Sequence, residues 1–240
     1  MKTRAKKKKM SQITQNLQKI RTTIFKETAN DSVKIIVVTK TRSVMEINKA
    51  IDSGALYLGE NRVQESEEKF RQIKAPVEKR LIGKLQSNKI KKAVTLFDSI
   101  DSVSSYSLAE KISKQCTGSE KKQRVLLQVN TSEEPTKNGF LQRDKKEIIR
   151  CFSLKGIKIE GLMTIGAHTK EKERVKKSFR DLKKLFLEIN GRLTKEQQMT
   201  ELSMGMSSDF LLAIKEGATM IRLGTSIFGE RKENSFRASP

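Results

Sequence analysis

The sequence predicts a single α/β domain built as a (β/α)₈, or TIM-type, barrel. Short apolar runs alternate with amphipathic segments through most of the chain, and such alternation requires a parallel sheet. Eight strand–helix units fit into about 200 residues, which is the size of such a barrel. The turn after the first strand, 39–43, contains no glycine, which disfavours an open doubly wound sheet.

An additional amphipathic helix precedes the barrel units. We expect it over 11–28, where apolar residues recur at helical spacing: Ile13, Leu17, Ile20 and Ile24. The first strand, 34–39, contains a run of consecutive β-branched residues, as is typical of a strand buried on both faces. The helix that follows, 44–53, ends at Gly54, because glycine readily adopts the backbone conformation of a helix end.

The rest of the chain repeats this strand–helix pattern. Pro76 separates the next helix from the strand after it, and Gly217 ends the last long helix. We expect further strands at 56–59, 80–82, 97–100, 125–129, 157–165, 201–204 and 220–223. We expect their helices at 63–73, 87–96, 105–116, 143–152, 172–193 and 209–216, with a short helical turn after the last strand.

Composition divides the chain into a disordered basic head at 1–10, a barrel domain at 11–231 and a polar tail at 232–240, with Met10 as an alternative start. No apolar region follows the head, so it is not a secretory signal, and no apolar run approaches the roughly 20 residues that span a bilayer. Cys116 and Cys151 show neither metal nor redox spacing, so we expect reduced thiols and a cytoplasmic protein without membrane contact.

The net charge of +22 favours contact with polyanions. The basic residues are nevertheless spread along the chain, and there is no Trp and only two Tyr for stacking on bases. We therefore expect any nucleic-acid binding to be non-specific. His168 is the sole histidine, which excludes His-rich zinc sites, and we expect it in a solvated loop.

Lys40 follows the most apolar strand of the chain. A lysine at the carboxyl end of a buried strand is partly withdrawn from water, which disfavours the charged ammonium and makes the amine a usable nucleophile. The alternative is an ordinary lysine whose side chain extends past the strand to solvent.

Active sites of barrels lie at the carboxyl ends of the strands. Here these ends carry Lys40, Asn61, Gly83, Asp101, Asn130 and Thr164, followed by the loops after the last two strands. The two loops supply Ser203, Gly205, Met206 and Ser207, and Gly224 and Thr225. Small residues let backbone N–H groups approach an anion, and barrels frequently bind phosphate at this place. Either loop alone fits a plain turn, but together with Lys40 they predict a phosphate-bearing ligand.

A phosphate beside a nucleophilic lysine suggests pyridoxal phosphate, held as a Schiff base. Arg222 lies among apolar residues of the last strand. If its side chain faces the carboxyl end, it donates to the ring nitrogen of this cofactor, which must then be unprotonated and a weaker electron sink. A structural ion pair is the alternative for Arg222. Nothing in the sequence indicates a metal site.

Several stretches in a matching order resemble the pyridoxal phosphate homeostasis protein family. They are VVTKT at 37–41, GENRVQE at 59–65, IGKLQSNK at 82–89, QVNTS at 128–132, GLMTI at 161–165, LSMGMSSD at 202–209 and IRLGTSIFG at 221–229. The resemblance implies a fold-type III barrel, similar to the amino-terminal domain of alanine racemase. The chain departs from the family at Lys79 and Arg80, where an aromatic–His pair is usual.

The same resemblance implies roles for individual residues. Lys40 becomes the Schiff-base lysine, and Arg222 faces the pyridine nitrogen. The phosphate lies among Ser203, Gly205, Met206, Ser207, Gly224 and Thr225. Asn61 lies near the cofactor, and Lys137 resembles a lysine implicated in cofactor exchange.

The expected function is therefore binding, homeostasis and transfer of pyridoxal phosphate, a vitamin B6 form, in a monomer whose partners are the cofactor and pyridoxal phosphate-dependent apoenzymes. Robust turnover is not expected, because related racemases need a second base, a tyrosine from an additional domain. Tyr57 and Tyr106 are not placed for this role. A racemase-like enzyme and a basic nucleic-acid-binding protein are the alternatives.

Overall fold

The computed structural model describes residues 10–28, 32–119, 121–132, 134, 136–167 and 169–230. The predicted basic head, apart from Met10, the predicted polar tail at 232–240 and the loop position of His168 lie outside the described residues.

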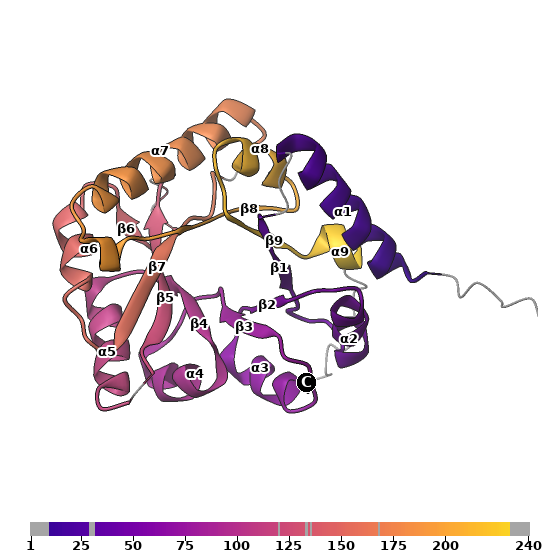
Figure 1. Ribbon diagram of the computed structural model, residues 1–240, viewed down its shortest axis with the longest axis horizontal. Coiled ribbons are helices and arrows are strands. Elements are labelled where there is room, and N and C mark those ends of the chain that lie inside the picture. The colour runs from indigo at the N-terminus through magenta and orange to yellow at the C-terminus, as the bar shows by residue number, and fades with distance from the viewer. Residues whose placement is uncertain are drawn as a thin grey trace, which may run out of the picture.

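Within this part of the chain, eight parallel strands close into a barrel with helices around it (Figure 1). Around the ring these are β1 (Lys34–Val38), β2 (Tyr57–Glu60), β3 (Glu78–Leu81), β4 (Ser99–Val103), β5 (Gln123–Asn130), β7 (Ile157–Met163), β8 (Glu201–Met206) and β9 (Met220–Leu223). Pairing of β1 with β9 and of β4 with β5 completes the ring. The predicted barrel is confirmed.

The outer layer consists of helices that follow the strands along the chain. They are α2 (Val44–Asp52), α3 (Val63–Phe70), α4 (Ile90–Leu96), α5 (Tyr106–Cys116), α6 (Lys145–Cys151), α7 (Lys172–Asn190), α8 (Phe210–Lys215) and α9 (Thr225–Phe228). Short 3₁₀ turns at Ser87–Lys89 and Lys195–Gln197 precede α4 and β8. Apolar side chains between these helices and the strands form the main core.

The predicted extra helix is also confirmed, as α1 (Gln12–Thr28). Its buried face consists of Leu17, Ile20 and Ile24, which pack onto the outside of the barrel. Figure 1 shows α1 beside α8 and α9, and the Nδ2 of Asn16 donates to the carbonyl of Ile227 at 2.9 Å. The helix therefore covers the outer wall where the first and last strands meet.

Several bounds differ from the prediction, and two of the differences matter for the site. β4 extends to Val103, so Asp101 lies buried inside the strand rather than at its carboxyl end. The prediction ended the strand at residue 100 because the apolar run stops before Asp101. The strand continues through Asp101 because its carboxylate pairs with Arg80. A two-residue strand, β6 (Phe140–Leu141), pairs with the end of β5. Gly139 makes this approach possible, since a Cβ there would lie 2.6 Å from the Asn130 nitrogen.

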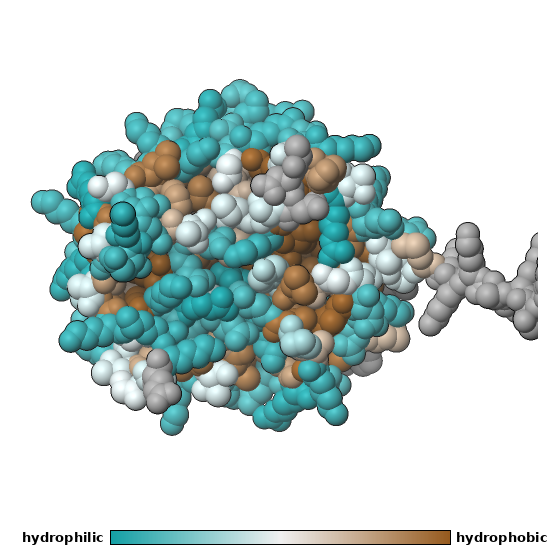
Figure 2. Space-filling view, in the orientation of Figure 1, coloured by the Kyte–Doolittle hydropathy of each residue, from teal (hydrophilic) through white to brown (hydrophobic). Residues whose placement is uncertain are grey.

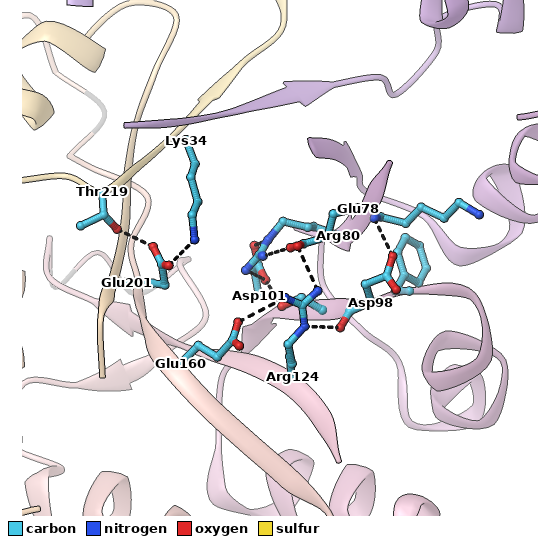
Figure 3. Close-up of polar contacts among 12 residues, drawn as sticks. Lys34, Glu78, Arg80, Asp98, Asp101, Arg124, Glu160, Glu201 and Thr219 are labelled. Atoms are coloured by element: carbon cyan, nitrogen blue, oxygen red, sulfur yellow. Dashed lines mark hydrogen bonds and ion pairs between the residues drawn. The ribbon is translucent and has the colours of Figure 1, made fainter. Parts of the chain in front are cut away.

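The inside of the barrel combines a small apolar cluster with charged groups. The cluster consists of Ile36, Leu126, Met163 and Met220. The charged groups lie mostly on residues near the amino ends of the strands, where Lys34 and Thr219 bond to Glu201, and Arg124 contacts Glu78 and Glu160 (Figure 3). Ion pairs thus close one end of the barrel and leave the carboxyl ends for a site.

Candidate functional site

Three adjacent strands, β8, β9 and β1, bring Ser203, Arg222 and Lys40 to one side of the barrel. Ile36 of β1 is in register with Arg222 of β9. Lys40 is half-buried just beyond β1, where the Thr39 N–H still donates to the Gly59 carbonyl at 2.9 Å. Lys40 therefore stands at the carboxyl end of β1, the strand whose Ile36 lines the barrel interior.

Arg222 is 5% exposed and bonds to neutral oxygens. Its Nη1 donates to the Ser203 Oγ at 2.9 Å, and its Nη2 donates to the Thr164 carbonyl at 2.8 Å. Burial lowers the pKa of Arg222 to about 10, against the opposing influence of Asp101 and Asp209, so the side chain stays protonated at neutral pH. Neither bond is the structural ion pair that was the alternative for this residue.

The loops after β8 and β9 meet at Ser207. Its Oγ accepts from the N–H groups of Gly224 and Ser226, each at 3.3 Å, and lies 3.1 Å from the Ser226 Oγ. Thr225, the first residue of α9, lies between these two donors. The structure therefore joins the two loops in which the sequence predicts a phosphate site.

Gly205 and Met206 shape the end of β8. Gly205 has a φ of +92°, and a Cβ there would lie 2.5 Å from the Ala213 Cβ, so only glycine fits. The N–H of Met206 donates to the Asp209 Oδ1 at 2.6 Å. Burial raises the pKa of Asp209, although this bond and Arg222 act in the opposite direction. Asp209 is thus a half-buried acid beside the loop that sequence reasoning did not single out.

Asn61 is half-buried directly after β2. It lines a cavity of about 890 Å³ between the loops after β2 and β3, together with Arg62, Gly83 and Lys84. The two loops approach so closely that a Cβ on Gly83 would lie 2.2 Å from the Asn61 carbonyl oxygen. Asn61 therefore stands at the carboxyl ends of the strands, on the side of β1 away from β9.

Lys137 comes from the loop after β5, across the ring from β1. Its ammonium donates to the Ser132 Oγ at 3.2 Å, the Glu134 Oε1 at 2.8 Å and the Gly166 carbonyl at 2.8 Å. These bonds connect the loops after β5 and β7, and none of them joins Lys137 to the loops after β8 and β9.

A buried polar group beneath the Lys40 turn was not predicted. Lys69 of α3 donates to the Thr39 carbonyl, to Glu60 and to Glu65. Burial raises the pKa of Glu60, despite the bonds from Lys69 and Thr39. Burial also acts to raise the pKa of Glu65, but bonds from Lys69 and the Thr41 N–H outweigh it and the pKa is lowered. The ion pair between Glu65 and Lys69 could have been predicted from their spacing of four residues on one helix face. The bond from Lys69 to the end of β1 could not.

Comparison with known proteins agrees with this architecture. The family model of the alanine racemase N-terminal domain matches residues 9–232. A pyridoxal phosphate homeostasis protein of Pasteurella multocida is 34% identical over 226 residues, which cover 92% of this chain and 96% of that protein. The chain belongs to the pyridoxal phosphate homeostasis protein family.

Two solved structures are similar to this homeostasis-family chain over most of its length. PipY of Synechococcus elongatus PCC7942, with pyridoxal phosphate bound, is 34% identical with a TM-score of 0.82, covering 90% of this chain and 100% of PipY. An alanine racemase of Clostridium difficile is 18% identical with a TM-score of 0.75, covering 92% of this chain and 58% of the racemase, which shows the shared barrel fold alone. Within the described ranges, none of the helices has the length and apolar character needed to cross a bilayer.

Proposed function

We propose that this chain binds pyridoxal phosphate at the carboxyl ends of its barrel strands, holds it as a Schiff base through Lys40, and transfers it to pyridoxal phosphate-dependent apoenzymes in the cytoplasm. The observation that carries the proposal is the agreement between two facts. Adjacent strands present a lysine, a buried arginine and two joined Ser/Gly/Thr loops. The protein PipY, similar over its whole length, has pyridoxal phosphate bound in its solved structure.

The donor groups of the site fit the chemistry of this cofactor. The Ser207 hydroxyl and the N–H groups of Gly224 and Ser226 are suitable donors for a phosphate. Pyridoxal phosphate supplies an aldehyde, which condenses reversibly with an amine, and Lys40 supplies that amine. Arg222 is protonated and has no acceptor capacity, so it can donate to a ring nitrogen but cannot receive a proton from it. This restrains carbanion chemistry and favours storage over turnover.

The positions of the tyrosines also support a carrier rather than a racemase-like enzyme. Tyr57 is the first residue of β2, the strand end away from Lys40, and its ring centroid lies 5.9 Å from the Lys34 ammonium. Tyr106 begins α5 in the outer layer and is covered by the Arg150 guanidinium at 4.0 Å. Neither position suits a base that acts opposite Lys40.

Absorbance and mass mapping test the proposal. With added pyridoxal phosphate the chain is expected to absorb in the near-visible, and borohydride is expected to fix a pyridoxyl group on Lys40. Lys40→Ala is expected to lose both signals. Lys92→Ala, which removes an exposed lysine paired with Glu67, is the matched control and should keep them.

A wild-type chain that stays colourless in excess cofactor would contradict the proposal. Transfer is measured by the reactivation of a pyridoxal phosphate-dependent apoenzyme. We expect reactivation on addition of the wild-type chain loaded with the cofactor, and none with the same loaded chain after borohydride reduction. Turnover of alanine that disappears in Lys40→Ala would instead select the racemase-like alternative.

A further inference from the structure

The turn that carries Lys40 has an unusual backbone. The next residue, Thr41, has a φ of 62°, in the left-handed region that β-branched residues rarely adopt. Such conformations persist only where the surrounding structure enforces them, and they concentrate at functional sites. Because Thr41 directly follows Lys40, whatever holds this turn also fixes the direction in which the Lys40 side chain leaves the backbone.

The buried ammonium of Lys69 is linked to the peptide groups on both sides of Lys40, to one directly and to the other through Glu65. The Nζ of Lys69 donates to the carbonyl of Thr39 at 2.7 Å, directly before Lys40. It also donates to the Glu65 Oε1 at 2.6 Å, and the same oxygen accepts from the N–H of Thr41, directly after Lys40, at 2.5 Å. Thr39, Lys69, Glu65 and Thr41 thus form a chain of bonds around the turn, which we call the Lys69 clamp.

Glu60 is a second carboxylate that bonds to Lys69 beneath the turn. Its side chain is fully buried, and its Oε1 accepts from Lys69 at 2.9 Å and from the Thr39 Oγ1 at 2.7 Å. Its Oε2 has no partner within the described residues. Buried ion pairs are often no more stable than an apolar filling of the same volume. An apolar side chain at 69 would fill the space, but it could not donate to the Thr39 carbonyl.

We propose that Lys69 is a positioning residue for Lys40. Through the Thr39 carbonyl and Glu65 it holds the strained turn so that the Lys40 amine is presented to the aldehyde of the cofactor. This inference rests on the proposed function, since it assigns Lys69 a part in cofactor capture without any contact between Lys69 and the cofactor.

The test compares three variants with the wild-type chain. Lys69→Met removes the donor and keeps the length of the side chain. Lys69→Met combined with Glu60→Gln removes both members of the buried Lys69–Glu60 ion pair. The loss of Lys69 then leaves no unpaired buried carboxylate at Glu60 to destabilise the fold. Lys92→Met is the control, because Lys92 is an exposed lysine of α4 that pairs with Glu67 of α3, the helix that also carries Lys69.

Two measurements are made on full-length chains below their unfolding temperatures. Hydrogen exchange of the Thr41 amide, followed by NMR without cofactor, reports the clamp directly. Borohydride trapping with limiting pyridoxal phosphate, followed by peptide mapping, reports the share of pyridoxyl label on Lys40 relative to all other lysines. A folded chain whose stability alone had changed would keep this share.

We expect Thr41 exchange to rise at least tenfold, and the label share of Lys40 to fall at least fivefold, in both Lys69 variants and not in Lys92→Met. A double variant that is labelled at Lys40 like the wild type overturns this inference alone. A wild-type chain without label at Lys40 overturns the proposed function and this inference together.

Discussion

The buried guanidinium of Arg222 is held by a hydroxyl and a carbonyl rather than by a contacting carboxylate. Asp101 and Asp209 favour its charge from a greater distance, but burial has the larger effect on its pKa. A charged donor kept among neutral oxygens remains available to a further acceptor, because no carboxylate neutralises it. The side chain therefore contributes to stability and to the proposed ligand site at once.

Arg222→Met is expected to lower the free energy of unfolding by about 1–3 kcal/mol, because the Ser203 hydroxyl and the Thr164 carbonyl lose their donor while buried. It is also expected to weaken binding of pyridoxal phosphate. Denaturant unfolding and an absorbance titration measure the two effects. Arg192→Met is the control, since Arg192 is an exposed arginine paired with Glu188, and its effect should stay within about 0.5 kcal/mol. Equal stabilities of the two variants would contradict the assignment.

Individual site residues differ in how far the sequence could predict them. Lys40 and Arg222 are visible because each is a charged residue at or within an apolar strand. Lys69 is not, because its partner Thr39 lies 30 positions away and the two meet only when α3 packs behind the end of β1. Asp101 was misplaced for a similar reason, since its buried position depends on Arg80 from the neighbouring strand.

At the scale of elements, the connection from β2 to α3 carries the most distinctive chemistry. Glu60 ends the strand, and Lys69 lies in the last turn of the helix, so the two charges meet beneath the β1 turn. Burial raises the pKa of the Glu60 carboxyl above its ordinary value of 4.5, while Lys69 opposes the rise. The folded chain therefore takes up a proton at Glu60 at a higher pH than the unfolded chain does.

This difference predicts a pH dependence that Glu60→Gln removes. The contribution of Glu60 protonation to stability is complete below pH 4.5 and is lost as the pH rises through the higher folded-state pKa. The free energy of unfolding of the wild type, relative to Glu60→Gln, should therefore increase as the pH falls from neutral towards 4.5, by about 1.4 kcal/mol for each pH unit of the pKa difference. Urea unfolding of both chains across this range measures it, and a constant difference would contradict the assignment.

Most elements were predictable because strand and helix periodicities are local. The strand β1 can be predicted from its apolar run, and the helix α7 from its apolar stripe, because each pattern involves residues close together in the sequence. β6 was not predictable, since two residues carry no periodicity and its pairing depends on the close approach at Gly139. Helix ends also shifted: the predicted 63–73 is α3, Val63–Phe70, followed by a turn.

At the scale of the whole molecule, the barrel is closed at the amino ends of its strands by charged side chains. Arg80 is 1% exposed and lies between Glu78 and Asp101, as Figure 3 shows. Both oxygens of Asp101 accept from Arg80, at 2.8 and 2.9 Å, and Ser99 donates to one of them. Arg80 is one of the two residues, with Lys79, at which the sequence departs from the pattern that the family resemblance led us to expect.

Asp101→Asn should destabilise the chain by about 3–5 kcal/mol, because it removes one partner of a buried ion pair and leaves the other charge poorly compensated. Combining it with Arg80→Met should recover a large part of the loss, since no buried charge then lacks its partner. Thermal and denaturant unfolding of both variants measure this coupling. Additive losses in the double variant would show that the two side chains act independently.

The chain has a net charge of +22. Among the described residues the buried charged side chains are three acidic and three basic, so the excess positive charge of this part lies on half-buried and exposed residues: Glu60, Asp101, Glu201, Lys69, Arg80 and Arg222 are the buried ones. Six of these charges lie in residues 1–9, which leaves +16 for the rest of the chain. Figure 2 shows hydrophilic residues over most of one face, with hydrophobic residues in separate groups between them. Such a surface attracts polyanions without a shaped site.

Binding to a random-sequence DNA duplex is therefore expected to fall about a thousandfold between 50 and 200 mM salt if six phosphates are contacted. Lys40→Ala should leave this binding unchanged, and deletion of residues 1–9 should reduce the salt dependence. Fluorescence anisotropy at several salt concentrations measures it. Micromolar binding that survives physiological salt would favour the nucleic-acid-binding alternative.

Ring closure has a consequence for self-association. A strand at the border of an open sheet presents unpaired N–H and carbonyl groups, which can recruit a strand from another molecule. In the described chain every strand of the barrel has neighbours on both sides, and the additional β6 offers a border of two residues. Apolar strands such as β1 are thereby withheld from intermolecular pairing, so a folded population at high concentration is protected from fibrillar aggregation, and only unfolding would expose these segments.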